Sequence, residues 1–342
     1  MKISVTSKQL AIMALIVGIV PLFFNSPYIL SVFVLIGIYS LITIGLSLLM
    51  GYAGQISLGH AAFFGLGAYF SGVLTTTYQL SPWIALVIGI VVTGLLSFVI
   101  GIPILKLKEH FLAFATIGVN VILFVIFLGM ASITKGAAGL SGIPKLNLLG
   151  FLLHSEISFY YFTWVVVLII TLLSLNIVNS HVGRVLRGIH DSEIATRSLG
   201  VNVGKYKLHI FVLSAVFASI AGSLYAHFMN FITPSTFHIL VSIQFLVMVV
   251  VGGSQSIWGA ITGAFIMTMI SEGINHFLPM IMDVSGEIEI IAYGIVLILV
   301  VMFMPKGLIP TFSMLVDRFQ SKGNRILIEE DEEAYGKDYI GS

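Results

Sequence analysis

GYAGQISLGHAAFFGLGAY, residues 51–69, is the stretch that decides which kind of fold this chain can adopt. It holds five glycines, four alanines, no charged residue and three scattered polar side chains, Gln55, Ser57 and His60. Glycine costs about 0.8–1 kcal/mol relative to alanine inside a helix, so a water-exposed helix of this composition would be weak. In a bilayer, small residues let helix backbones approach closely, and neighbouring helices satisfy loosened backbone groups. The stretch therefore predicts a tightly packed membrane segment that is broken or re-entrant.

The composition of the whole chain agrees with a membrane location. Of its 342 residues, 58% are hydrophobic and 9% are charged, and the mean hydropathy is +1.08. A soluble domain carries about 25% charged residues, so this chain has too few to cover a water-exposed surface. Long apolar runs recur without the alternation of a membrane β-strand, and several reach the roughly 17 residues needed to cross a hydrocarbon core. The sequence predicts an all-α polytopic membrane protein in contact with the lipid bilayer.

We expect about ten transmembrane helices, some of them broken or re-entrant. Their predicted positions follow the apolar runs of the sequence. They are residues 9–24, 28–49, 51–74, 83–105, 111–131, 159–179, 207–229, 239–252, 259–279 and 288–304. The segments at 51–74 and 239–252 are the best candidates for broken helices, because the first is rich in glycine and the second is short.

The basic residues predict that both termini are cytoplasmic. With the N-terminus inside, all but two of the 16 lysines and arginines fall on cytoplasmic segments or at the adjoining helix ends, the exceptions being Lys135 and Lys145. This bias follows the positive-inside rule, so we predict a cell (inner) membrane protein. A transmembrane domain is expected over 1–310, with a cytoplasmic loop at about 180–206. An acidic, disordered cytoplasmic tail is expected over 311–342.

A second glycine-interrupted segment, GGSQSIWGAITG at 252–263, is similar to the first. Both place Gln and Ser between glycines and then enter an apolar helix, which in the two halves of a transporter indicates a substrate path. Two unrelated helices that use glycine for close packing are the alternative, and on that view Gly59→Ala should be mild and Gly59→Leu disruptive. The candidate path residues are Gln55, Ser57, His60, Gln255 and Ser256, and the candidate packing residues are Gly54, Gly59, Gly65, Gly259 and Gly263.

The sequence offers little for catalysis. It contains no cysteine, which excludes disulfides and Cys-based metal sites. His60 and His227 lack a second ligand at metal-binding spacing, and residues 200–206 depart from a phosphate loop in glycine spacing and in the missing Ser or Thr. Glu272, with His276 four residues later, is the one candidate intramembrane acid, and its predicted depth near the outer rim favours a structural or interfacial role. We expect no catalytic residue, cofactor, metal site or nucleic-acid partner.

Three blocks of sequence together resemble one family. GYAGQISLGHAAFFGLGAY, then TKGAAGLSGIP at 134–144, then a block over 183–234 that begins GRVLRGIHDSEIATRSLG, are similar to the LivM-type permease subunit of branched-chain amino acid ABC importers. The resemblance covers about residues 40–310 and keeps the family's order of blocks. It implies half of a translocation path, without an ATP site of its own. As partners it implies a LivH-type sister permease, two ABC ATP-binding subunits, a periplasmic or extracellular solute-binding protein and a small-molecule substrate.

The same resemblance makes residues 187–200 the coupling helix that docks in a groove of the ATP-binding subunit. Glu193, Ala195 and Gly200 take the places of the family's coupling motif, although the spacing from Glu193 to Gly200 is one residue longer than in the commoner importer form. The segment is charged and amphipathic, which suits a polar interface that transmits a rocking motion. The candidate coupling residues are Arg187, Asp191, Ser192, Glu193, Ala195, Arg197 and Gly200.

Two alternative functions stay open at this point. An ion-coupled secondary transporter would need a titratable cluster near the bilayer midplane, where only Glu272 is a candidate. A permease of the same family for another small solute, such as urea, amides or nucleosides, would share these sequence features. For either kind of permease we expect an uncharged path that binds weakly, with specificity in the solute-binding protein.

Overall fold

Helices make up nearly all of the described structure. The computed structural model describes residues 2–24, 26–107, 109–148, 151–152, 155–277, 287–304, 307–309 and 311. The predicted acidic tail therefore lies outside the described residues, apart from residue 311. The helices are α1 (Lys2–Phe23), α2 (Pro27–Leu46), α3 (His60–Thr76), α4 (Pro82–Ile104), α5 (Glu109–Gly129), α6 (Ala131–Thr134), α7 (Glu156–Asn179), α8 (His181–Asp191), α9 (Glu193–Ser198), α10 (Val203–Met229), α11 (Ile239–Gly252), α12 (Ile257–Phe277) and α13 (Glu287–Phe303).

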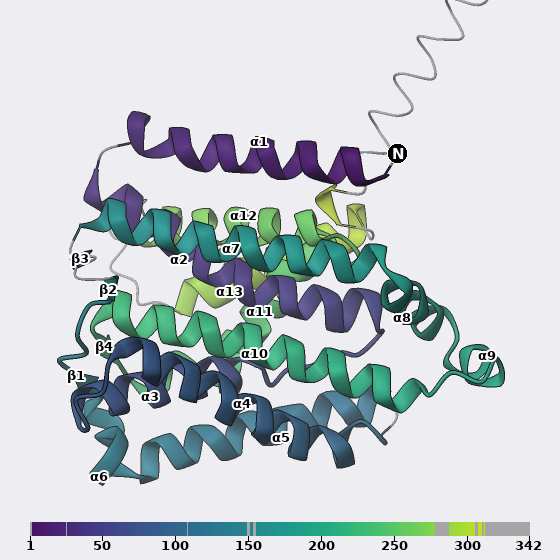
Figure 1. The fold of residues 1–342 in the computed structure, drawn as a ribbon, viewed down its shortest axis with the longest axis horizontal. Coiled ribbons are helices and arrows are strands. Elements are labelled where there is room, and N and C mark those ends of the chain that lie inside the picture. Colours follow the sequence, from purple (N-terminus) through teal and green to yellow (C-terminus); the bar gives the residue numbers. More distant parts are fainter. Residues whose placement is uncertain are drawn as a thin grey trace, which may run out of the picture.

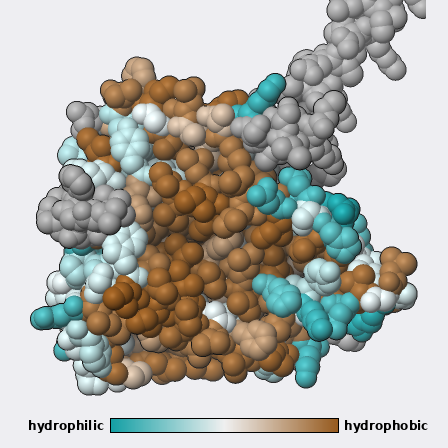
Figure 2. All heavy atoms as spheres, viewed as in Figure 1, coloured by the Kyte–Doolittle hydropathy of each residue, from teal (hydrophilic) through white to brown (hydrophobic). Residues whose placement is uncertain are grey.

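The long helices lie side by side, and their ends gather at two opposite faces of the molecule (Figure 1). One end carries the short strands and α6, and the other carries α8, α9 and the N-terminus. An apolar belt lies between these more polar ends (Figure 2). Among the described residues, six helical stretches are long and apolar enough to cross a membrane: Pro27–Tyr52, Pro82–Ile104, Phe111–Gly129, Glu156–Asn179, Val203–Met229 and Ile257–His276.

The predicted all-α polytopic class is confirmed. Each of the ten predicted segments overlaps a helix, and shorter apolar helices at Lys8–Phe23 and Ile239–Gly252 add to the six long stretches. The count of ten spans, the orientation of the termini and the domain division stay predictions. The segment predicted at 51–74 differs in detail, because its first residues belong to the preceding helix.

The first glycine-rich stretch is a helix that breaks. A π-helical turn, η1 (Ser47–Tyr52), extends α2, and residues 53–59 are then non-helical before α3 begins at His60. Gly54 stands in this break with φ of +66°, a left-handed conformation that glycine adopts without steric cost. The sequence thus ends the helix at Tyr52 and restarts it at His60, after seven non-helical residues.

The second glycine-rich stretch is a tight hairpin between α11 and α12. Gly253, with φ of +112°, ends α11, and only residues 253–256 separate the two helices. A Cβ atom on Gly263 would overlap the carbonyl oxygen of Met248, and one on Gly259 would lie 2.6 Å from the carbonyl oxygen of Gly252. The two backbones touch because neither position carries a side chain.

The centre of the bundle is a close crossing of α3 and α10. A Cβ atom on Gly67 would overlap the carbonyl oxygen of Ser219, and one on Gly222 would overlap that of Phe64. Glycines therefore serve on both helices to bring the backbones together. This crossing holds α3, which follows the first break, in a fixed position against α10, which follows α9.

A short loop structure covers the end of the bundle opposite α8. Strand β1 (Leu140–Ser141) pairs antiparallel with β4 (Phe231–Ile232), so Leu140 lies opposite Ile232. Strands β2 (Asn147–Leu148) and β3 (Phe151–Leu152) form a second antiparallel pair. The 3-10 turns η2 (Gly136–Ala138) and η3 (Pro234–Phe237) flank these strands. The loop is thereby attached to the end of α10.

Candidate translocation and coupling site

The two breaks lie against each other in the structure. The Ser47 hydroxyl donates a hydrogen bond to the carbonyl oxygen of Ser254 at 2.6 Å, and the Tyr52 hydroxyl donates to that of Gln255 at 2.7 Å. A Cβ atom on Gly51 would overlap the carbonyl oxygen of Ser254. These bonds satisfy carbonyl groups of the turn between α11 and α12, which lie in neither helix. Two segments about 200 residues apart in the sequence therefore form one structural unit.

The last turn of α8 touches this unit. The Gln255 side-chain nitrogen lies 3.4 Å from Nε2 of His190. A Cβ atom on Gly54 would lie 3.4 Å from the Cα atom of His190. One residue at the end of α8 thus contacts both breaks. Sequence analysis did not single out His190, although it stands directly before the predicted coupling residues Asp191 and Ser192.

Glu193 forms one ion pair within α9 and one that holds α9 against the start of α10. Ser192 begins α9 by accepting a hydrogen bond from the Ala195 backbone nitrogen. Glu193 then pairs with Arg197 at 2.8 Å and with Lys207 at 2.5 Å. Such pairs near the surface contribute roughly 0–1 kcal/mol each, so they fix orientation more than they add stability. Glu193 and Arg197, both expected at a docking face, are partners of each other within this chain.

Two large apolar side chains stand out on α9 and just after it. Ile194 is 81% exposed and Leu199 is 83% exposed, the highest values among the large hydrophobic side chains of the described residues. They lie at the polar end of the molecule, where Figure 2 shows apolar atoms at the position of α9 beyond the polar residues around α8. Gly200 follows with φ of +83° and ends the turn. We call Ile194 and Leu199 the apolar tip.

The predicted path residues fall into three environments. Ser57 and His60 belong to a buried chain, because Nδ1 of His60 lies 3.1 Å from the Ser57 hydroxyl and Nε2 lies 2.7 Å from that of Ser214 on α10. Gln55 is 2% exposed, and its amide has no hydrogen-bond partner among the described residues. Gln255 is exposed beside α8, and Ser256 accepts a hydrogen bond from the Gly259 backbone at the start of α12. The structure therefore does not gather these residues into one pocket.

The candidate packing glycines all lie close to other atoms. A Cβ atom on Gly65 would lie 2.7 Å from the Phe127 ring, and one on Gly59 would lie 2.8 Å from the carbonyl oxygen of Thr116. Real Cβ atoms essentially never approach within 3.0 Å, and the atom facing Gly59 is backbone. The expectation that Gly59→Ala would be mild is therefore at odds with this geometry, because alanine already overfills the position.

A second buried chain of polar groups was missed by sequence analysis. Ser71 on α3 lies 2.8 Å from Nε2 of His227 on α10, and Ser223 donates to Ser71 at 2.8 Å. Nδ1 of His227 lies 2.7 Å from the carbonyl oxygen of Pro144 in the loop at the strand end. His227 thus joins α3, α10 and that loop, which is a structural role. Among the described residues, no group of three or more His, Cys, Asp and Glu could hold a metal ion.

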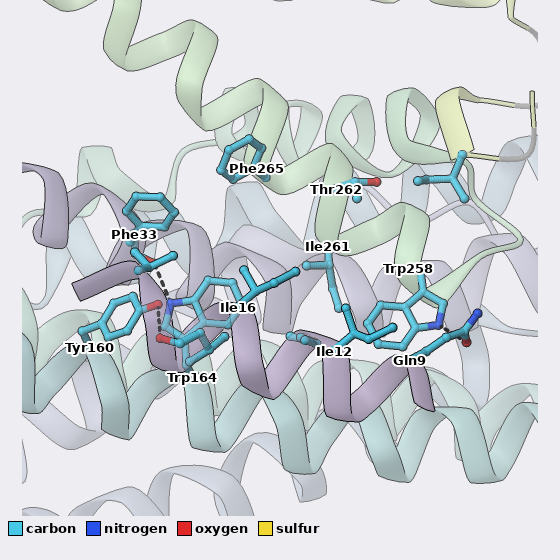
Figure 3. A pocket seen from close by; sticks show the side chains of 14 residues that line it. Gln9, Ile12, Ile16, Phe33, Tyr160, Trp164, Trp258, Ile261, Thr262 and Phe265 are labelled. Carbon is cyan, nitrogen blue, oxygen red and sulfur yellow. Dashed lines mark hydrogen bonds between the residues drawn. The ribbon is translucent and has the colours of Figure 1, made fainter. Parts of the chain in front are cut away.

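A large apolar groove lies between α1, α2, α7 and α12 (Figure 3). Its volume is about 610 Å³. Polar groups at its edges are already bonded, since Trp258 Nε1 donates to Gln9 at 3.1 Å and the Tyr160 hydroxyl donates to the carbonyl oxygen of Val17 at 3.0 Å. The groove suits hydrocarbon and offers almost nothing to recognise a polar solute. Its apolar lining includes Ile12, Ile16, Phe33, Ile261 and Phe265.

Comparison with known proteins agrees with this arrangement. The family model for "Branched-chain amino acid transport system / permease component" matches residues 28–303. The chain is 30% identical over 296 residues to the high-affinity branched-chain amino acid transport system permease protein LivM of Escherichia coli K12, covering 80% of this chain and 68% of that protein. It is 24% identical over 317 residues to the probable LivM of Methanocaldococcus jannaschii, with 80% and 91% covered.

More distant similarity extends to a second permease protein named for branched-chain amino acid transport. The chain is 25% identical over 245 residues to the probable branched-chain amino acid transport permease protein LivH of Methanocaldococcus jannaschii, covering 69% of this chain and 76% of that protein. No solved structure matches the chain.

Proposed function

We propose that this chain, which belongs to the permease-component family of branched-chain amino acid transport systems, works as the membrane subunit of an ABC importer. It is a transport permease for branched-chain amino acids and not an enzyme in its own right. A LivH-type sister permease would supply the other half of the path. Two ABC ATP-binding subunits would supply the energy, and a soluble solute-binding protein would deliver the substrate.

The apolar tip carries the assignment of the coupling site. An isoleucine and a leucine that stand in water at the polar end of a membrane protein each forfeit about 1.5–3 kcal/mol of burial free energy, unless a partner covers them. Protein interfaces commonly place such apolar side chains at their buried centre, inside a polar rim. We infer that Ile194 and Leu199 enter the groove of an ATP-binding subunit. Arg187, Asp191 and Arg197 would form the polar rim around them.

The contacts behind the tip suggest how movement reaches the path. The pair from Glu193 to Lys207 holds α9 on α10, and His190 touches both breaks. A shift of α8 and α9 on ATP binding would therefore push on the junction of Gly54 and Gln255. Broken helices suit such a role, because their non-helical residues can change conformation while the flanking helices stay rigid.

The orientation follows from the same proposal. ATP-binding subunits are cytoplasmic, so the end with α8, α9 and the N-terminus would face the cytoplasm, and the strand end would face the solute-binding protein. Ten spans of the cell (inner) membrane, with both termini on the cytoplasmic side, are consistent with this placement. Urea, amides and nucleosides remain alternative substrates that a transport assay must exclude. An ion-coupled secondary transporter has no observation here in its favour.

Co-purification tests the docking site directly. Ile194→Ser and Leu199→Ser each replace an exposed apolar side chain by a small polar one, so the chain itself should insert and fold as before. The ATP-binding subunits should co-purify with these variants at a tenfold or lower yield, since loss of about 2 kcal/mol of burial exceeds a tenfold change in affinity.

Leu107→Ser is the matched control. Leu107 is an exposed leucine in the turn after α4, at the same end of the bundle, and it lies outside the α8–α9 segment. Its substitution should leave co-purification unchanged. Equal yields of ATP-binding subunits for Ile194→Ser, Leu199→Ser and the wild type would contradict the proposed docking site.

A further inference from the structure

A small polar pocket lies inside the apolar belt, between α2, α11, α12 and α13. Its volume is about 60 Å³, which holds a few water-sized groups. It leaves no room for the aliphatic side chain of a bound amino acid beside them. Unlike the groove of Figure 3, it is lined largely by oxygen-bearing side chains. These are Tyr39, Gln244, Thr268, Ser271, Glu272 and Tyr293.

One side chain of this pocket is buried without a hydrogen bond. Thr268 is 3% exposed, and its hydroxyl has no partner among the described residues. Threonine on a helix usually satisfies its hydroxyl with the carbonyl group one turn earlier, as Thr75 does with Ser71. Other buried hydroxyls also lack a partner, Thr93 and Thr163 among them, but the Thr268 hydroxyl lines a polar pocket, so a ligand in that pocket can bond it.

Glu272 supplies a carboxylate to the same pocket. It accepts a hydrogen bond from the Tyr28 hydroxyl at 2.8 Å, and the ring of His276, one turn later on α12, lies 6.3 Å from the Tyr28 ring. Glu272 follows Ile257, the first residue of α12, by about 22 Å along the helix. Its bond to Tyr28, in the first turn of α2, keeps it near the end of the bundle, at the rim predicted from the sequence. A carboxylate is still costly to expose to lipid there, so we infer that this side of the molecule faces protein or a polar path.

The opposite faces of the bundle give the contrast. On α4 the outward side chains are apolar, including Ile84, Val87, Val91 and Leu95. Those surfaces suit lipid contact. The face with Glu272 and Gln244 instead joins a carboxylate to an amide. It is therefore the best position for the wall of a path shared with a sister subunit.

We propose that this pocket binds the primary ammonium group of the transported amino acid. An ammonium group has three donors, and here it would meet the Glu272 carboxylate, the Thr268 hydroxyl and one further oxygen of the lining. The rest of the amino acid would lie outside the pocket, in the half of the path that the sister permease completes. The inference rests on the proposed function, and it replaces the expected uncharged path by one with a single weak cation site.

Ligand-observed NMR on the purified full-length chain in lipid nanodiscs tests the pocket with two probes. Isopentylamine keeps the ammonium group of leucine without its carboxylate, and 4-methylpentanoate keeps the carboxylate without the ammonium group. Saturation transfer should reach isopentylamine and should be absent for 4-methylpentanoate. Glu272→Gln should abolish the isopentylamine signal. Thr268→Val, which keeps the side-chain shape, should weaken binding about fivefold.

Controls make each outcome decisive. Gln9→Ala removes a polar group from the distant apolar groove and should leave the isopentylamine signal unchanged. An unchanged signal in both Glu272→Gln and Thr268→Val would overturn the proposal. A signal that sodium chloride removes and choline chloride does not would also overturn it, since the site would then prefer a metal cation.

Failure of this inference can be told apart from failure of the proposed function. If ATP-driven uptake persists while Glu272→Gln binds isopentylamine normally, the chain is an importer subunit and the pocket assignment is wrong. If ammonium binding depends on Glu272 while uptake needs no ATP-binding subunit, the pocket assignment stands and the importer mechanism is wrong.

Discussion

Gly51→Ala tests whether the two breaks act as one unit. A Cβ atom on Gly51 would overlap the carbonyl oxygen of Ser254 and would lie 2.9 Å from the backbone nitrogen of Gln255. Both are backbone atoms, so a rotamer change cannot relieve the clash. Overpacking of this kind costs about 1–3 kcal/mol, and the displaced Ser254 carbonyl would also lose much of its hydrogen bond from Ser47, worth about 1 kcal/mol.

The expected result is a loss of stability of about 2–4 kcal/mol. At roughly 2–4 °C per kcal/mol, the Tm in detergent should fall by roughly 4–16 °C, and uptake should fall with it. Gly118→Ala on α5 is the matched control, because nothing lies within 4 Å of the new methyl group. Alanine there should keep or slightly raise the Tm through its better helix propensity. Equal Tm values for Gly51→Ala and Gly118→Ala would refute the claim that the breaks are in contact.

Three further substitutions separate the roles of the α8–α9 segment and the breaks. Glu193→Lys places a third positive charge beside Arg197 and Lys207, so uptake and substrate-stimulated ATP hydrolysis should fall at least tenfold while membrane insertion persists. Glu193→Gln only loses the two ion pairs, so both activities should fall much less. Equal activity of the two variants would contradict charge repulsion as the cause. His190→Ala should lower the amount of substrate moved per ATP hydrolysed in an intact complex, and an unchanged ratio would remove His190 from the transmission route. Gln55→Leu replaces an unpaired buried amide by an apolar side chain of similar size, so the Tm should stay the same or rise while the uptake rate falls. Loss of complex assembly in this variant would instead make Gln55 a packing residue.

Much of the fold was predictable because apolar runs and basic ends are local signals. The ten predicted segments each overlap a helix, and the two glycine-rich stretches were recognised as unusual. What local patterns do not contain is the pairing of distant segments. The contact of Tyr52 with Gln255 joins residues 203 positions apart, and only the packed bundle reveals it.

The candidate site was harder to predict for a physical reason. Sequence analysis looked for charge in the cytoplasmic loop, and it placed Glu193 on a docking face without seeing that Lys207 would pair with it. Ile194 and Leu199 gave no signal because apolar residues are ordinary in a chain that is 58% hydrophobic. An apolar residue inside the most polar segment is the clue that could have found them. Ser71 and Ser223 were missed because serines in membrane helices commonly bond their own backbone.

ATP dependence of uptake tests the central claim most directly. The chain and its sister permease are reconstituted in proteoliposomes with the solute-binding protein, with or without the two ATP-binding subunits, and leucine uptake is measured with a proton or sodium gradient present in both cases. The account predicts uptake only when the ATP-binding subunits and hydrolysable ATP are present, and loss of that uptake in Ile194→Ser. Gradient-driven uptake without the ATP-binding subunits would contradict it.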